Sequence, residues 1–262
     1  MQANSTYMKR IMEESGVKSA LRVFEILELF ELRRRPLPLS EIVEELGYPV
    51  SSASALLKSM LGMGYLDYDR ARRWYFPTMR VALLGRWVEE AMFGDTQLLA
   101  AMEELHRETD EAVVLAVQND LTARYVHLVY SDKPLQFRAR PGLKRPLARS
   151  GMGWALLSQK SDAEIEQLRH RINAEAEEPI SREELMKHIE TTRALGYAFS
   201  KHAFSEGVGL IAAPLPKTRF GKVFGLAVAG YVSRLERDEA HIVASLKATV
   251  ARLSEEPFKQ AS

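Results

Sequence analysis

The sequence of 262 residues contains no cysteine. This absence excludes disulfide bonds, a thiolate nucleophile and cysteine-ligated zinc. Long apolar runs are also absent: GLIAAPL and VFGLAVAGYV have the length of strands, well short of the roughly 20 residues that span a bilayer. The opening MQANSTYMKRIMEESGVKSA lacks the apolar core of a secretory signal. We therefore expect a cytoplasmic protein with no membrane partner.

An excess of either charge is lacking too. Lysine and arginine number 36 against 35 aspartate and glutamate, giving a formal net charge of +1. Overall charge thus gives no reason to expect a nucleic-acid partner, and any such case must come from local clusters. The 46% of hydrophobic residues suffices for a sizeable core. The length predicts two modest domains or one large one.

Catalytic signatures are missing as well. The sequence has no HExxH zinc motif, no GxSxG nucleophile elbow and no phosphate loop ending in Gly-Lys-Ser/Thr. None of the six histidines forms an i, i+4 pair. They are His106, His127, His170, His188, His202 and His241. We therefore expect no catalytic residue, no metal site and no cofactor.

What is present begins with helical periodicity near the N-terminus. After a polar, unpatterned segment 1–16, expected to be a flexible arm, apolar spacing predicts a helix over 17–32. The prolines of RRRPLPLS end that helix. Ser40 and Gly47 have the residue types of an N-cap and a C-terminal stop for a second helix, 41–46. A third helix is predicted over 49–61, and aromatic strands over 65–68 and 74–76 flank the basic turn DRARR.

Three short helices followed by a hairpin is the order of a winged helix-turn-helix, which reads double-stranded DNA with its third helix. Small hydroxyl residues on that helix allow close approach and base readout, and arginines in the wing tip suit phosphates. The predicted DNA contacts are Ser51, Ser52, Ser54, Lys58, Arg70, Arg72 and Arg73. The plainer interpretation is that Ser51 only caps its helix and that the turn arginines are only solvated.

The rest of the chain alternates helical and strand patterns. Helices are expected over 96–109, 154–158, 162–171, 182–195 and 236–253, and strands over 112–117, 122–130, 135–138, 197–200, 208–214 and 223–232. RPGLKRPLARSGMG is expected to be a loop before the helix at 154, and the last two strands, joined by LPKTRFGK, are expected to form a hairpin. These patterns predict an α+β region with an antiparallel sheet.

Expected boundaries are 17–78 for the winged domain, 79–94 for a linker helix and 95–262 for the second domain. An apolar face on the linker helix predicts packing against a second copy in a homodimer. Its residues are Leu83, Leu84, Trp87 and Val88. The alternative is that this helix packs on its own domain.

Several of these segments together resemble the IclR family of bacterial transcriptional regulators. SALRVFEILELF, LPLSEIVEELGYPVSSASALLKSMLGMGYLDYD and RRWYFPTMRVALLG are similar to the family's first helix, helix-turn-helix and wing with linker helix. GLKRPLARSGMGWALL resembles its effector loop and helix, and GVGLIAAPL and VFGLAVAG resemble its last core strands. The resemblance implies a winged helix-turn-helix followed by a GAF-like, antiparallel-sheet effector domain. It also implies dimers or tetramers, and repression or activation governed by a small molecule.

The effector site is expected between the RSGMGW segment and the last two core strands. Arg149 and backbone N–H groups at Gly151 to Gly153 could receive the carboxylate of an aromatic or aliphatic acid. Arg140, Lys144 and Arg145 are equally plausible cations. The predicted effector residues are Arg149, Ser150, Gly151, Met152, Gly153, Trp154, Leu210, Ala212, Ala227 and Ala229. For the last four the alternative is ordinary core packing.

The sequence departs from the family pattern at several of these positions. Ala55 stands where many members carry arginine before the double leucine, and Trp154 stands where lysine is common. Ala227 and Ala229 replace small hydroxyl residues, so we expect a less polar pocket floor. Two other functions stay open: a small-molecule enzyme built on the same effector domain, and an adaptor that does not bind DNA.

Overall fold

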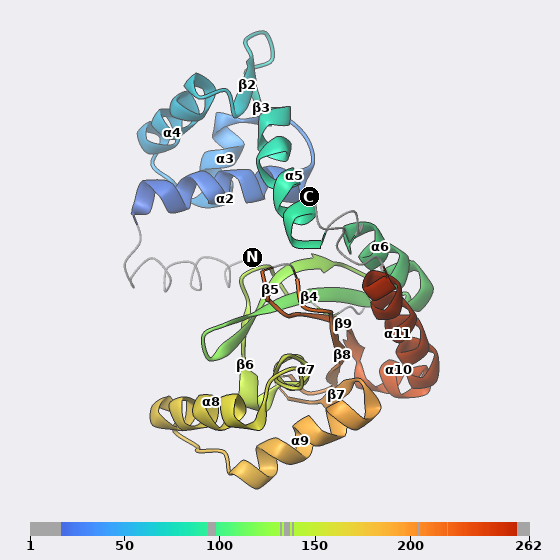
Figure 1. The fold of residues 1–262 in the computed structure, drawn as a ribbon. Helices are drawn as coiled ribbons and strands as arrows, with labels where there is room; N and C mark the ends of the chain where they lie inside the picture. The colour runs from blue at the N-terminus through green and yellow to red at the C-terminus, as the bar shows by residue number, and fades with distance from the viewer. Residues whose placement is uncertain are drawn as a thin grey trace, which may run out of the picture. The chain divides into compact units, whose positions relative to one another are not determined.

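The computed structural model divides the chain into two compact units, Met1–Val88 and Glu89–Ser262 (Figure 1). It describes residues 17–93, 98–131, 133, 137, 139–203, 205–218 and 220–255. The expected flexible arm, 1–16, lies outside the described residues, as does most of the strand expected over 135–138.

The first unit contains the three expected helices: α2 (Lys18–Arg33), α3 (Leu39–Leu46) and α4 (Val50–Gly62). Apolar residues at helical spacing face a common centre, which explains why these short helices are stable together. The buried core of this unit consists of Ile26, Leu29, Phe30, Leu37, Ile42, Leu57, Met60 and Leu66.

Helix α3 ends where the sequence predicts, but it begins before the residue predicted as its N-cap. Gly47 ends the helix in the left-handed conformation, with φ of 66°, and its N–H donates to the Val43 carbonyl, as a glycine stop predicts. The start was predicted wrongly. Pro38 occupies the N-cap, the helix begins at Leu39, and no side chain caps it, so Ser40 is already helical.

The wing is a three-stranded antiparallel sheet and not only a hairpin. Strands β2 (Leu66–Asp69) and β3 (Trp74–Pro77) pair as expected, and β1 (Leu37–Pro38) pairs with the other edge of β3, giving the order β1-β3-β2. Sequence patterns missed β1 because two residues carry no periodicity. The helix α5 (Met79–Phe93) follows β3, and the boundary between the two units, after Val88, falls within it.

The second unit is built on a six-stranded antiparallel sheet in the order β6-β5-β4-β9-β8-β7 (Figure 1). The central strands β9 (Phe224–Tyr231) and β8 (Val208–Pro214) are almost wholly buried, and β4 (Ala112–Asn119) is buried over residues 112–116. β5 (Thr122–Val129) and β6 (Lys144–Pro146) extend one side, and β7 (Ala198–Lys201) forms the other edge. The predicted hairpin of the last two strands is confirmed as β8 paired with β9.

Both faces of this sheet are covered, so side chains alternate between two cores (Figure 1). Val114 and Ala116 pack toward the face that carries α7 (Gly151–Leu157), α8 (Asp162–Glu175) and α9 (Arg182–Leu195). Val113 and Leu115 pack toward the face with α6 (Leu98–Thr109), α10 (Val232–Arg237) and α11 (Glu239–Glu255). Within the described residues, no helix is long and apolar enough to cross a membrane.

Three short elements here are not predicted from the sequence, and one predicted helix begins earlier than expected. The RPGLKRPLARSGMG segment, predicted as a loop, contains strand β6 and the short 3-10 helix η1 (Leu147–Arg149). Helix α7 begins at Gly151, earlier than the predicted 154. Helix α10 fills the interval between β9 and the closing helix. Each case concerns an element of three to seven residues, which is too short for periodicity to reveal.

Candidate functional site

Helix α4, the predicted recognition helix, presents one polar face to solvent and one apolar face to its unit. Ala53, Leu57 and Met60 are fully buried, which turns Ser51, Ser54 and Lys58 outward, and all three are exposed. Pro49 occupies the N-cap, and no side chain bonds to the helix start. Ser51 is therefore not a cap, and the plainer interpretation of that residue is wrong.

Ser52 differs from its neighbours because another helix holds it. The Nη1 atom of Arg22 in α2 donates to Ser52 Oγ at 2.8 Å, and the same guanidinium lies over the Tyr48 ring, 4.8 Å from its centroid. Ser52 is half-buried as a result. Arg22 was missed by sequence reasoning because it belongs to a helix whose contacts with α4 are tertiary.

The wing tip is ordered by Asp69. Its Oδ1 accepts the backbone N–H groups of Ala71 and Arg72 at 2.8 and 3.0 Å, and these bonds hold the pKa of the exposed carboxyl below its usual range. The Arg72 side chain lies 3.4 Å from Asp69 Oδ2 and 5.5 Å from the centroid of the Trp74 ring. Arg73 adopts a left-handed φ of 55°. The turn thus exposes Arg70, Arg72 and Arg73 together on a defined backbone.

The linker helix α5 has an apolar face that its own unit leaves exposed. Leu83, Leu84 and Trp87 are 57%, 55% and 64% exposed, and Val88 is half-buried. In the single chain these three side chains therefore do not pack back on their own domain, as the alternative interpretation would require.

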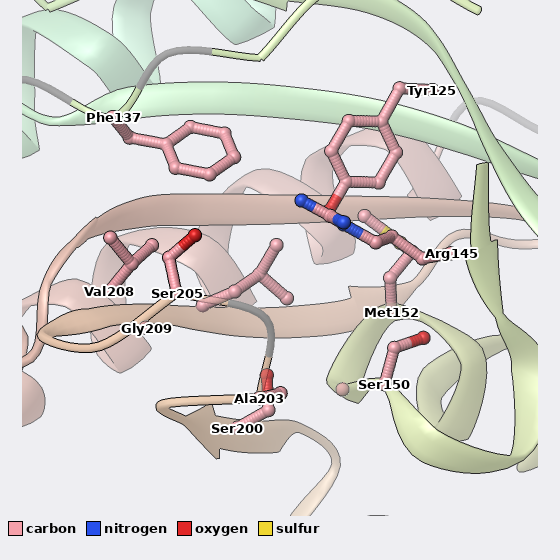
Figure 2. Close-up of a pocket in the computed structure, with 12 residues that line it drawn as sticks. Tyr125, Phe137, Arg145, Ser150, Met152, Ser200, Ala203, Ser205, Val208 and Gly209 are labelled. Carbon is pink, nitrogen blue, oxygen red and sulfur yellow. The ribbon is translucent and has the colours of Figure 1, made fainter. Parts of the chain in front are cut away.

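The second unit contains a cavity of about 110 Å³ between β5, β6, the start of α7 and the β7–β8 connection. Figure 2 shows Tyr125, Phe137 and Arg145 on one side of it, facing Ser150, Ser200, Ala203 and Ser205. Met152, Val208, Gly209 and Leu210 also line it, as does Gly151. Of the predicted effector residues, the structure brings Ser150, Gly151, Met152 and Leu210 to this cavity.

One end of the cavity is polar. The guanidinium of Arg145 reaches the hydroxyl of Tyr125 (Figure 2). Burial raises the pKa of the Tyr125 phenol, and the hydrogen bond and charge of Arg145 oppose that rise. The sequence offers Arg145 only as an alternative cation to Arg149. Tyr125 was missed, since a tyrosine in a strand carries no signal of which face it occupies.

Arg149, the cation first expected at the effector, lies elsewhere. Its Nη2 donates to the Glu178 carbonyl at 2.9 Å, and its Nη1 is 3.8 Å from Glu184 Oε1. It is exposed and does not line the cavity. The short helix η1 explains this, because it rotates the chain between Arg145 and Ser150.

The glycines of RSGMGW are required by packing. A Cβ at Gly153 would overlap the Leu147 carbonyl, and one at Gly151 would lie 2.7 Å from Ser200 Oγ. Ser150 Oγ caps α7 by accepting the Gly153 N–H at 3.0 Å and donates to the Pro146 carbonyl at 2.7 Å. The Gly153 N–H, one of the donors expected for a carboxylate, is therefore already used.

The other predicted effector residues surround the cavity at a greater distance. Ala212, Ala227 and Ala229 are fully buried in the core beneath it, as their plainer interpretation had it. Trp154 donates its Nε1–H to the Ala148 carbonyl at 2.9 Å and stacks on His188. Among the described residues, no three His, Asp or Glu side chains are grouped to hold a metal ion.

Two family profiles match the chain, one for each unit. The IclR helix-turn-helix domain matches residues 19–70, and the bacterial transcriptional regulator IclR C-terminal domain matches residues 96–255. The first range includes the recognition helix and the second includes every residue that lines the cavity.

Individual relatives agree with these profiles. The chain is 25% identical to the HTH-type transcriptional regulator KdgR of Dickeya chrysanthemi, over 92% of this chain and 79% of the relative. It is 26% identical to the transcriptional repressor IclR of Escherichia coli, over 85% and 83%. Solved structures include the Thermotoga maritima IclR, at TM-score 0.63, 18% identity and coverage of 92% and 99%. The effector domain of an IclR regulator from Acinetobacter sp. ADP1 matches at TM-score 0.56 and 27% identity, over 61% of this chain and 94% of that one. The protein belongs to the IclR family of DNA-binding bacterial transcriptional regulators.

Proposed function

We propose that this regulator binds a specific operator through α4 and the wing, and that a small organic acid in the effector-domain cavity controls this binding. The observation that supports the effector class is the polar end of the cavity, where Arg145 meets Tyr125. A guanidinium can donate two parallel hydrogen bonds to a carboxylate, and a buried phenol can donate a third. The remaining lining is largely apolar, which suits the carbon skeleton of an acid.

The volume of the cavity also limits the size of the effector. A protein cavity of about 150 Å³ holds benzene, and this one measures about 110 Å³. A short aliphatic acid therefore fits better than an aromatic one. Two serine side chains that also line the cavity, Ser200 and Ser205, offer hydrogen bonds to a second polar group on such a molecule.

Control of DNA binding requires that the effector prefer one arrangement of the protein. A ligand that binds two states equally shifts nothing. The cavity is formed by segments distant in sequence, namely β5–β6, α7 and the β7–β8 connection, so a bound acid would fix their spacing. A coupling of about 1–3 kcal/mol is typical and would change operator affinity about 5- to 150-fold.

The test is a thermal-shift screen of short-chain metabolite acids on the full chain. At 100 times its dissociation constant, a ligand stabilises a protein by about 2.7 kcal/mol. Arg145→Gln should abolish the shift given by a hit, because the carboxylate loses its bidentate partner. Arg149→Ala is the matched control and should retain the shift, since its guanidinium contacts Glu178 and Glu184 instead. Hits that survive Arg145→Gln would place the acid outside this cavity.

A further inference from the structure

We infer that Arg22 is a positioning residue for DNA recognition: it fixes the Ser52 hydroxyl as a hydrogen-bond donor to a base acceptor in the operator. The inference rests on the proposed use of α4 for DNA binding. It concerns a residue of α2 that lies outside the predicted recognition surface. Its basis is the contact between Arg22 Nη1 and Ser52 Oγ, 2.8 Å long.

The chemistry of the hydroxyl makes this contact directional. A serine hydroxyl has one hydrogen to donate and two lone pairs that accept. Arg22 can only donate, so it occupies a lone pair and leaves the hydrogen of Ser52 available. A charged donor also polarises the hydroxyl and strengthens it as a donor. The Ser52 hydroxyl therefore acts as a donor to acceptor atoms on DNA.

The position of Ser52 in the helix leaves that hydrogen unused. Serine in a helix often donates to the carbonyl four residues earlier, and Ser59 in the same helix does so, to Ala55 at 3.0 Å. Ser52 is the third residue of α4, and among the described residues its hydroxyl donates to no acceptor. Residues near the start of a recognition helix are those that meet base edges in the major groove.

Arg22 is itself held in place. Its guanidinium lies over the Tyr48 ring, 4.8 Å from the centroid, and the side chain is half-buried between α2 and the start of α4. A flat guanidinium can stack on an aromatic ring while its edge donates a hydrogen bond, which a lysine cannot reproduce. The stack therefore orients the donor, and the donor orients Ser52.

In the major groove, hydrogen-bond acceptors are N7 and O6 of guanine, N7 of adenine and O4 of thymine. A donor-only Ser52 should favour these groups and should disfavour the amino groups of cytosine and adenine. Arg22 thus contributes to sequence preference without touching a base. Direct contact of Arg22 with a phosphate would instead strengthen binding to every sequence and add to the salt dependence.

The experiment compares the base preferences of the full-length protein and its variants, selected from a randomised duplex library at fixed salt. Ser52→Ala should lose preference at one base pair by about 2- to 10-fold, the range of one net hydrogen bond. Arg22→Ala should lose preference at the same base pair, and the double variant should lose no more than either single one. Arg22→Lys should recover only part of the preference, and Ser59→Ala should keep the wild-type profile.

Two results would overturn the inference. In one, Arg22→Ala keeps the preference at the Ser52 position while the slope of log affinity against log salt falls by about one, which marks a phosphate contact. In the other, both Arg22→Ala and Ser52→Ala keep the wild-type profile. Failure of the proposed DNA function is distinguishable, because the wild-type protein itself would then select no sequence. Melting temperatures of all variants separate loss of recognition from loss of folding.

Discussion

The indole of Trp154 stacks face to face on the imidazole of His188, with ring centroids 3.8 Å apart and planes 3° apart. Trp154 belongs to α7, the helix that begins at the cavity, and His188 belongs to α9, which covers that helix. The stack therefore joins the helix beside the proposed effector to the outer layer of the unit.

This stack predicts a pH dependence of stability. Burial lowers the pKa of His188 from its ordinary value of 6.5, so the folded state prefers the neutral ring. As pH falls below about 6.5, the unfolded chain binds a proton that the folded chain resists, and stability decreases. His188→Gln should reduce the loss of melting temperature between pH 7 and pH 5. The control is His170→Gln in α8, where the side chain is 70% exposed and its surface ion pair with Glu166 contributes little, so the wild-type loss should remain. An unchanged pH profile for His188→Gln would contradict the prediction.

The two glycines of α7 should respond differently to alanine. Gly153→Ala places a Cβ against the Leu147 backbone, which cannot move independently, so we expect about 2–4 kcal/mol of destabilisation. Gly151→Ala meets the Ser200 side chain, whose hydroxyl can rotate but whose Cβ, 2.9 Å from the added methyl, moves only with the edge strand β7. Stability should still fall less than at Gly153, because this overlap is less severe than the one with the Leu147 backbone, and the cavity should become smaller. Chemical denaturation measures the first effect and ligand-induced thermal shifts the second. Gly62→Ala is the control, because a Cβ there meets nothing within 4 Å. Equal losses at Gly151 and Gly153 would show that the backbone contact is not decisive.

The wing should contribute mainly electrostatic affinity. Each phosphate contact adds about 0.9 to the slope of log affinity against log salt. Arg72→Ala together with Arg73→Ala should therefore lower that slope by nearly two and weaken binding to all sequences alike. Electrophoretic or anisotropy titrations on a fragment of the protein's own upstream region, at several salt concentrations, measure this. Arg140→Ala, an exposed arginine of the other unit, should leave the slope unchanged. An unaltered slope in the double variant would remove the wing from the DNA interface.

The sequence predicted elements with strong local signals and failed where contacts are tertiary. The helices α2, α4 and α9 and the hairpin of β8 and β9 follow from periodicity and turn residues, and the structure has them. The two-residue strand β1 carries no pattern of its own and exists only because β3 offers it an edge. Periodicity therefore cannot predict such an element.

The same limit applies to the sites. The glycines in RSGMGW lie at the start of α7, and four of the predicted effector residues line the cavity there. The cation was assigned differently because η1 turns Arg149 away and leaves Arg145 beside Tyr125. Arg22 was overlooked for a related reason, since its partner Ser52 is 30 residues away. Which side chains meet across such distances depends on packing and not on spacing.

The last prediction concerns assembly. A single winged module makes a small interface with DNA, so recognition generally uses two half-sites and a symmetric dimer. Trp87 is 64% exposed and lies with Leu83 and Leu84 on α5, so a second copy of this helix could bury a continuous apolar face. Leu84→Ser with Trp87→Ser should convert a dimer to monomers at micromolar concentration in analytical ultracentrifugation. Operator affinity should fall with it, because two half-sites no longer bind together.

The matched control for this variant is Phe220→Ser, because Phe220 is 65% exposed on the effector domain and lies outside the proposed interface. It should leave both the sedimentation coefficient and operator affinity unchanged. Exposed side chains contribute little to folding, so each variant should change the free energy of unfolding by no more than about 0.5 kcal/mol. Melting temperatures measured on dilute monomer should therefore stay close to the wild-type value. A wild-type protein that sediments as a monomer and still binds its operator tightly would contradict the role of α5. So would a double variant that remains dimeric, because the contact between copies would then lie on another surface.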